Sequence, residues 1–362
     1  MTNSTVSRPV SREEFEIAIV CAIPLEYDAV VILLDQCWDE GCDPYGRARG
    51  DYNTYTTGSI GSFNVVILLL PGTGKAEAAS SAASLRSSYP GVKLLFLNGI
   101  CGGVPNVKGE ELLLGDVIIS KTVVQYDIGN QYPDVFKIKD TIEERLGRAS
   151  KDIRGFTTIL ETELESHRLE ERAAFLLDVI QRKSEEGHQR RRKLYTYPGS
   201  SNDKLFEASY RHKHRILPTC ECSNGYQEEG PVCEDSRKLS CNELGCDYAR
   251  LVPRSRLEEK KKFEMDGNIK DAQAPSIFVG RVGSGDTVLR SGIDRDRLAR
   301  EHGILAFEME GSGIWDEFPC IIVKGICDYA DSHNNTDWQN FAAATAASVV
   351  KGLIERYPKT DE

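Results

Sequence analysis

Three acidic residues follow apolar, strand-like runs of the sequence: Glu26 after "IAIVCAIPL", Glu310 after "ILAFEM" and Asp328 after "VKGIC". Open α/β sheets form their sites at the carboxyl ends of their strands, so these carboxylates are candidates for one shared cleft. Together they could protonate a leaving group, activate water and bind a diol. The structural alternative is that Glu26 and Asp328 only stabilise the N-terminal ends of helices.

The motif "FEMEG" adds Glu308 and Met309 to the candidate residues. We expect the two glutamates, on either side of Met309 at a strand end, to point to opposite faces. One carboxylate would then face a cleft, and the other would face solvent or a partner. A carboxylate accepts paired hydrogen bonds from vicinal hydroxyls such as those of a ribose, and a methionine offers an apolar surface to a sugar or base. The alternative is a core methionine flanked by structural acids.

Two glycine-containing segments directly follow predicted strands: "PGTGK" at residues 71–75 and "NGICGGVP" at residues 98–105. We expect both to be turns in which backbone N–H groups approach an anion or a sugar closely. Neither segment matches the P-loop or the dinucleotide-binding fingerprint, and ordinary tight turns are the alternative. The candidate binding residues in these segments are Thr73, Gly74, Asn98 and Gly99.

Apolar strand-like runs alternate with helical patterns and must position these residues. The predicted strands are residues 15–23, 63–70, 93–98, 116–124, 276–282 and 319–327, with a further strand or strand end at 303–313. Helices are predicted at residues 25–34 and 76–85, and a last helix begins at the capping-box spacing of Thr336 and Gln339. This alternation predicts an α/β fold with a parallel or mixed sheet covered on both faces.

One domain is predicted over residues 15–357, between short tails at residues 1–14 and 358–362. A charged insertion interrupts it at about residues 136–274. Within the insertion, residues 157–183 have the pattern of one or two amphipathic helices. The rest of the insertion is predicted to be loop.

The composition argues against several classes of protein. A net charge of -11 disfavours a general binder of nucleic acids or membrane surfaces, and no apolar run is long enough to cross a bilayer. The N-terminal segment lacks the apolar core of a signal peptide. Several of the 11 cysteines, such as Cys21 and Cys320, lie in apolar runs, which is typical of free buried thiols in a reducing compartment. We therefore expect a cytoplasmic protein.

Cysteines and histidines of the insertion raise the alternative of a structural zinc site. They are Cys220, Cys222, Cys233, Cys241 and Cys246, with His212 and His214. The first cysteine pair has C-x-C spacing rather than the usual C-x2-C, and no second close pair completes a zinc ribbon. Unpaired loop thiols are the expectation, with no metal.

Seven motifs occur in the order found in the nucleoside phosphorylase and nucleosidase superfamily, which the chain resembles over about residues 15–125 and 276–357. They are "IAIVCAIPLEYDAV", "GTGK", "LNGICGGVP", "GDVIIS", "SGDTV", "FEMEG" and "VKGICDYAD". The last part of the sequence is particularly similar to the fungal branch. The resemblance implies a three-layer α/β/α fold around a mixed, barrel-like sheet, a homo-oligomer such as a dimer, and cleavage of a ribosyl N-glycosidic bond.

The resemblance also implies roles for individual residues. Asp328 would protonate or hydrogen-bond N7 of a purine leaving group, and Met309 and Glu310 would hold the ribose. Asp127 in "VVQYDIG" would supply a further polar contact. No metal or organic cofactor is implied, and the partner would be a small-molecule purine nucleoside.

Departures from the superfamily's patterns favour a particular reaction. Glu26 and Asn98 stand where phosphate-binding arginines occur in phosphorylases, whereas the nucleosidases use a glutamate at position 26 to activate water; this favours a hydrolase. Val288 stands where methylthioadenosine-cleaving enzymes stack a phenylalanine, which favours 5′-hydroxyl purine nucleosides such as inosine, guanosine or adenosine. The alternatives are a phosphorylase that binds phosphate through an arginine such as Arg281, and a nucleoside-sensing module without catalysis.

Overall fold

The structure is a computed structural model that describes residues 7–39, 45–139, 146–186, 195–217, 219–223, 232–333 and 336–359. One nine-stranded sheet dominates it, in the order β12-β11-β8-β13-β5-β1-β4-β3-β2. These strands are β1 Ile17–Cys21, β2 Gln36–Cys37, β3 Tyr55–Ile60, β4 Phe63–Leu69, β5 Leu94–Gly103, β8 Val117–Gln125, β11 Ile277–Ser284, β12 Ile304–Glu308 and β13 Cys320–Asp328. Two small hairpins pair β6 (Asn106–Val107) with β7 (Glu110–Glu111) and β9 (Gly129–Gln131) with β10 (Phe136–Ile138).

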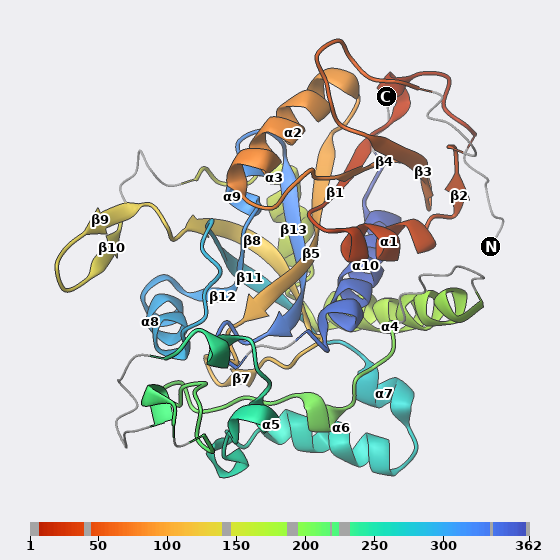
Figure 1. Ribbon diagram of the computed structural model, residues 1–362. Coiled ribbons are helices and arrows are strands. Elements are labelled where there is room, and N and C mark those ends of the chain that lie inside the picture. Colours follow the sequence, from red (N-terminus) through yellow and green to blue (C-terminus); the bar gives the residue numbers. More distant parts are fainter. Residues whose placement is uncertain are drawn as a thin grey trace.

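The sheet closes on itself at one end. Strand β12 pairs with β11 and also with β5, where Ala306 lies opposite Gly103 and Phe307 lies opposite Gly102. Strands β5, β13, β8, β11 and β12 therefore form a closed ring (Figure 1). The ring contains both parallel pairs, such as β13 with β5, and antiparallel pairs, such as β13 with β8. The predicted mixed, barrel-like sheet is confirmed.

Ten helices surround the sheet within the described residues. They are α1 Pro24–Ile32, α2 Lys75–Ser88, α3 Lys151–Ile159, α4 Glu163–Glu186, α5 Cys241–Leu244, α6 Ser255–Met265, α7 Ile269–Gln273, α8 Gly292–His302, α9 Gly311–Ile314 and α10 Gln339–Arg356. The last helix begins at Gln339, with Trp338 as its N-cap and without a side-chain cap from Thr336. The predicted capping box there was wrong.

Alternate residues of β1 show how the layers are built. Ile17, Ile19 and Cys21 belong to a core with α1, α4 and α10, whereas Ala18 and Val20 pack on the opposite face with α2 and α9. Successive side chains of a strand point to opposite faces, so a continuous apolar strand is buried by helices on both sides. The three-layer α/β/α arrangement is the direct result.

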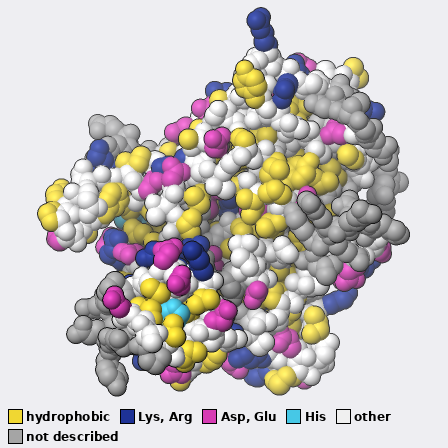
Figure 2. Space-filling view, viewed as in Figure 1, with side chains coloured by type: hydrophobic (Ala, Val, Ile, Leu, Met, Phe, Trp, Pro, Cys, Tyr) yellow, Lys and Arg dark blue, Asp and Glu magenta, His cyan; other side chains and the backbone are white. Residues whose placement is uncertain are grey.

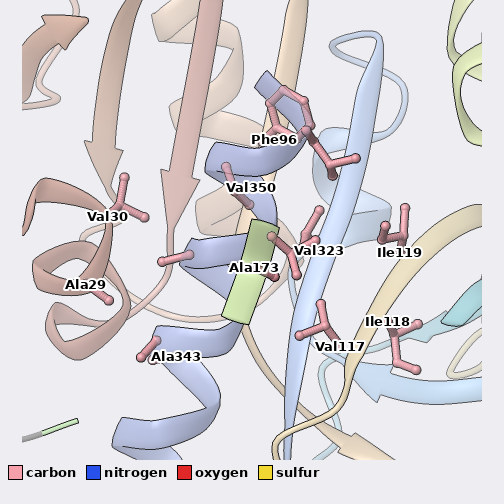
Figure 3. Close-up of a cluster of buried hydrophobic side chains, with 14 of the residues drawn as sticks. Ala29, Val30, Phe96, Val117, Ile118, Ile119, Ala173, Val323, Ala343 and Val350 are labelled. Atoms are coloured by element: carbon pink, nitrogen blue, oxygen red, sulfur yellow. The ribbon is translucent and has the colours of Figure 1, made fainter. Parts of the chain in front are cut away.

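Helix α10 lies in the centre of the larger core. Figure 3 shows its Ala343 and Val350 beside Val323 of β13 and Phe96 of β5, with Ala173 of α4 close by. The small residues of α10 let it approach the sheet closely. The amphipathic pattern predicted at residues 157–183, for one or two helices, corresponds to α4 and to the last residues of α3, and α4 contributes buried side chains to this core.

One glycine-rich segment differs from its prediction. The stretch "NGICGG" is not a turn, because β5 continues through it to Gly103 and pairs with β13 over the same residues. Its glycines instead make room for side chains. A Cβ at Gly99 would collide with Glu26 Oε1, and a Cβ at Gly102 would lie 2.9 Å from Asp328 Oδ1.

The part of the insertion that carries α5, α6 and α7 lies beyond the carboxyl ends of β5 and β13 (Figure 1). On the face drawn in Figure 2, acidic and basic side chains are interspersed with hydrophobic ones rather than gathered into one basic patch. None of the helices within the described residues is long and apolar enough to span a membrane.

Candidate active site

A cavity of about 290 Å³ lies where β5, β12 and β13 end and α1 begins. The predicted residues Glu26, Glu308, Met309, Glu310 and Asp328 all line it. Thr73 and Val288, two further predicted residues, line it as well. The remaining wall is largely apolar and includes Tyr126, Leu289 and Phe307. The cavity thus brings together carboxylates from three separate segments of the chain.

Glu26 is held by backbone amides from two elements. Its Oε2 accepts N–H bonds from Ala22 at 2.8 Å and from Ile23 at 3.2 Å, just before α1. Its Oε1 accepts an N–H bond from Ile100 of β5 at 2.9 Å. Burial raises the pKa of Glu26, while Lys324 and the amide hydrogen bonds oppose that shift. Glu26 therefore caps α1 and also presents a fixed carboxylate to the cavity.

Lys324 of β13 is a buried cation among three carboxylates. Its Nζ lies 3.2 Å from Glu310 Oε2 and 3.7 Å from Glu308 Oε2. A Cβ at Gly99 would lie 2.9 Å from this Nζ while colliding with Glu26, so Lys324 and Glu26 meet over the same backbone. Burial alone lowers the pKa of a lysine, but Glu310, Glu26 and Glu308 together raise the pKa of Lys324 well above its ordinary value.

Glu308 and Glu310 do not point to opposite faces. Both carboxylates reach Lys324, because side chains two residues apart in a strand share a face and β12 ends at Glu308. Glu308 accepts N–H bonds from Glu310 at 3.0 Å and from Gly311 at 2.9 Å, so it fixes the start of α9. Burial raises its pKa, an effect that Lys324 opposes.

Glu310 connects the cavity to the "PGTGK" turn. Its Oε1 accepts an N–H bond from Gly74 at 3.2 Å, and its Oε2 accepts one from Lys324. Gly74 has a φ of 103°, a conformation that favours glycine, and is the N-cap of α2. The predicted turn is confirmed, but its backbone N–H group contacts a carboxylate of the protein.

Asp328 ends β13 beside the cavity. Its Oδ1 accepts the N–H group of Ala330 at 2.8 Å, so the carboxylate also caps the turn that follows the strand. Burial raises the pKa of Asp328, and the nearby Asp331 adds to the shift. The hydrogen bonds from Ala330 and Cys327 and the charge of Arg290 oppose this rise in pKa without cancelling it. Asp328 is therefore suited to hold a proton.

The residue after Asp328 is anchored by the insertion. The hydroxyl of Tyr329 donates to Asp203 Oδ1 at 2.8 Å, and Arg254 lies 2.7 Å from the same carboxylate. Arg295 of α8 donates to the carbonyl of Tyr329 at 2.8 Å. These buried contacts fix the strand end that carries Asp328.

Four predicted site residues lie behind the cavity rather than on its wall. Asn98 is fully buried, with Nδ2 3.4 Å from the carbonyl of Glu26, and Gly99 gives space to that side chain. Gly74 binds Glu310. Asp127 forms an ion pair with Lys75 at 2.6 Å. Asn98, Gly99 and Gly74 thus contact Glu26 or Glu310 of the wall, whereas Asp127 does not.

Several residues of the site were missed by the sequence reasoning. Lys324 had a detectable signal, since a lysine inside the apolar run "IIVKGIC" must find an acidic partner when buried. Arg290, Cys101 and Gln339 also line the cavity, but nothing in their local sequence marks them. Arg281, the arginine considered for phosphate, donates to the carbonyl of His302 and is not part of the wall.

Replacing Lys324 by methionine is expected to destabilise the protein by about 3–5 kcal/mol, because three buried carboxylates lose their shared counter-charge. The free energy of unfolding from denaturant titration measures this loss. Methionine at the exposed Lys121, which pairs with Glu161 on the surface, is the control and should cost less than about 1 kcal/mol. Equal small losses for both variants would show that Lys324 is not the shared counter-ion.

Comparisons with known sequences show which proteins the chain resembles. The sequence model of the Phosphorylase superfamily matches residues 16–176, which extends into the predicted insertion. The chain is 28% identical over 364 residues to a nucleotide-binding leucine-rich repeat (NLR)-like protein of Hyaloscypha variabilis, covering 97% of this chain and 30% of that protein. It is 29% identical over 89 residues to a 5′-methylthioadenosine/S-adenosylhomocysteine nucleosidase of Mycobacterium bovis, covering 23% of this chain and 35% of that protein. Each match thus spans about a third of the relative's length.

Solved structures share the fold at low sequence identity. Futalosine hydrolase of Helicobacter pylori superposes with a TM-score of 0.52 at 14% identity, covering 96% of this chain and all of that one. A 5′-methylthioadenosine/S-adenosylhomocysteine nucleosidase from S. pneumoniae gives a TM-score of 0.52 at 16% identity, covering 94% of this chain and 99% of that one. With the superfamily match over residues 16–176, the closed mixed sheet and the shared fold, the chain is similar to the nucleoside phosphorylase and nucleosidase superfamily.

Proposed function

We propose that the protein is a purine nucleoside N-ribohydrolase, which cleaves the N-glycosidic bond to give a free purine base and ribose. The observation that carries this proposal is the buried carboxylate of Glu26, fixed by three backbone amides on the wall of a cavity that also contains Asp328. A fixed base near water and a separate protonated acid are what hydrolysis of a glycosidic bond requires.

The surroundings of the two acids support different roles. Glu26 has amide donors and Lys324 nearby, which favour its charged form, so it acts as the base that takes a proton from water. Asp328 is buried beside Asp331, which disfavours its charge, so it donates a proton or a hydrogen bond to the departing base. The oxygen of water bonds to C1′, the bond from C1′ to nitrogen breaks, and its electron pair leaves with the base.

Glu310 and Met309 would hold the sugar. Gly74 and Lys324 bind one oxygen each of the Glu310 carboxylate, and each carboxylate oxygen can accept a further bond from a ribose hydroxyl. Met309 lines the cavity beside it. Glu308 has a supporting role, because its oxygens already accept the amides of α9.

The charge of the site favours water over phosphate as the nucleophile. Three glutamates line the cavity, and their shared cation, Lys324, lies behind them. A phosphate dianion beside these carboxylates would be repelled. Arg290 is the arginine on the described wall, and Arg281 is engaged elsewhere. The relatives with hydrolase or nucleosidase names point the same way.

A purine is proposed as the base because its N7 can accept the proton of Asp328. Tyr126, Phe307 and Leu289 offer apolar surface for a bicyclic ring. The test is release of free base from inosine, guanosine and adenosine, with uridine and cytidine as controls. Cleavage of at least one purine nucleoside, with the pyrimidine nucleosides spared, is expected; equal cleavage of uridine would contradict the assignment to purines.

The match to an NLR-like protein over nearly the whole chain favours one second candidate, a nucleoside-binding module without catalysis. Calorimetric binding of inosine, guanosine or adenosine without any release of base over hours would establish it. The hydrolase assignment would then fail while the binding site stands.

A further inference from the structure

Two cysteines and two histidines from distant parts of the chain meet in one group. They are His212, Cys241, Cys246 and His333, and one potential ligand atom from each lies within 4.8 Å of the others. Cys246 and His333 are 87 residues apart in the sequence. Three of the four residues are buried. From this geometry we infer that they form a structural Cys2His2 zinc site.

The distances are those of a tetrahedral metal site. Nδ1 of His333 lies 3.6 Å from the sulfur of Cys241 and 3.9 Å from the sulfur of Cys246. Zinc with sulfur ligands at about 2.3 Å and nitrogen ligands at about 2.0 Å places the ligand atoms roughly 3.3 to 3.8 Å apart. A small inward movement of the side chains is enough to bind the ion.

The hydrogen bonding of both histidines supports a metal. Nε2 of His333 lies 2.8 Å from the carbonyl of Tyr210, so this nitrogen carries the proton and Nδ1 is left as a free donor to metal. A second hydrogen bond of this kind is typical of zinc-bound histidines. Nε2 of His212 is buried without a hydrogen-bond partner, which lowers the stability of the folded protein. Metal binding at the cluster would help to offset this loss.

The local backbone positions the thiols of Cys241 and Cys246. Ser240 caps the short helix α5, and Gly245 ends it in the left-handed conformation, with a φ of 73°. This turn brings Cys241 and Cys246 back toward each other. Two thiolates would balance the charge of Zn²⁺, so the loaded site would be neutral and its burial inexpensive.

A second candidate zinc site is formed by a different set of residues. His214, Cys220 and Cys233 form another group within 4.8 Å. The sulfur of Cys222 lies 3.2 Å from that of Cys220 and 3.7 Å from that of Cys233. Three thiols and one imidazole are a common set of ligands for structural zinc. The expectation of unpaired loop thiols is therefore replaced by two adjacent zinc sites.

The first site would connect the insertion to the turn that follows Asp328 at the end of β13. His333 follows Asp328 by five residues, and the backbone N–H of His212 donates to Ser332 at 3.2 Å. The ring of His333 also stacks on Phe206 at 4.2 Å. A zinc ion here would be a cross-link between α5 and the turn after β13. Its role is structural, and the reaction needs no step at the metal.

Zinc content of the purified full-length chain tests both sites without any activity assay. After dialysis against a chelating resin, mass spectrometry of the metals should find about two zinc ions per chain. Cys241→Ser and His333→Asn should each lose one ion, and Cys220→Ser and His214→Asn should each lose the other. Cys37→Ser and His167→Asn, both exposed and outside the clusters, should lose none.

Each outcome decides the inference. Loss of one ion in the Cys241 and His333 variants alone would support the first site and overturn the second. Absence of zinc, or zinc that survives all four ligand variants, would overturn both, whereas a disulfide between Cys241 and Cys246 would overturn the first site. If a variant fails to fold, the wild-type protein produced with Co²⁺ should show the visible absorption of tetrahedral thiolate-bound cobalt, and an octahedral spectrum would contradict the sites.

Discussion

Replacing Glu26 by glutamine is expected to lower the turnover of inosine, or of whichever purine nucleoside is cleaved fastest, by about 10²-fold or more. The amide keeps the size of the side chain but cannot take a proton from water. Steady-state release of base measures the effect. Because Glu26 accepts three backbone N–H bonds, the same variant should also melt at a lower temperature, and activity must be measured well below that temperature.

A matched control separates catalysis from stability. Glu111 also accepts two backbone N–H bonds, from Ser255 and Arg256, but it does not line the cavity. Glu111→Gln should lower the melting temperature and leave turnover within about twofold. Normal turnover in a folded Glu26→Gln protein would remove Glu26 from the mechanism.

The pH dependence follows from the same carboxylate. A base must be ionised, so kcat/KM of the wild-type protein should fall as the pH falls through the pKa of Glu26. Because burial raises that pKa, the acid limb of the profile should lie above the ordinary range of a glutamate. If the residual activity of the Glu26→Gln variant shows the same acid limb as the wild-type protein, that limb belongs to the ionisation of another group.

Replacing Asp328 by asparagine is expected to lower purine nucleoside turnover by about 10²-fold, since the leaving base then receives no proton. The loss should be much smaller for p-nitrophenyl riboside, because nitrophenolate leaves without protonation. Comparing the two substrates separates the loss of an acid from general damage to the site. An equal loss for both substrates would contradict the role of Asp328 as proton donor.

Asp331 provides the control for this variant. Like Asp328 it is buried with a raised pKa, and it accepts a backbone N–H bond, from His333 at 2.8 Å. It does not line the cavity. Asp331→Asn removes one cause of the raised pKa of Asp328 but leaves burial, the largest, in place, so it should lower the turnover of purine nucleosides much less than Asp328→Asn. An equal defect of the two asparagine variants on both substrates would point to the loop rather than to the acid.

The strands of the sheet and most residues on the wall of the cavity could be predicted from the sequence, because both depend on local patterns. Apolar runs of strand length marked β1, β5 and β13, and an acid directly after such a run marked Glu26 and Asp328. Helix α4 followed from amphipathic spacing, whereas most of α3 lies before the predicted range. Each of these signals lies within a few neighbouring residues.

The features that were missed depend on contacts between distant segments. The closure of the ring by β12 and β5, and the shared contact of Glu308 and Glu310 with Lys324, appear only when separate strands pair. The sequence analysis predicted unpaired loop thiols because Cys220 and Cys222 have C-x-C spacing and no second close pair completes a zinc ribbon, whereas His333 of the first group lies outside the insertion. Local spacing cannot reveal such ligands.

The most direct test of the central claim is the sugar product of the reaction with and without phosphate. Inosine, guanosine and adenosine are incubated with the pure protein, and base, ribose and ribose 1-phosphate are separated. Free base and ribose formed at the same rate in phosphate-free buffer are expected for a hydrolase with Glu26 as the base. Ribose 1-phosphate, formed only when phosphate is present, would contradict it and identify a phosphorylase.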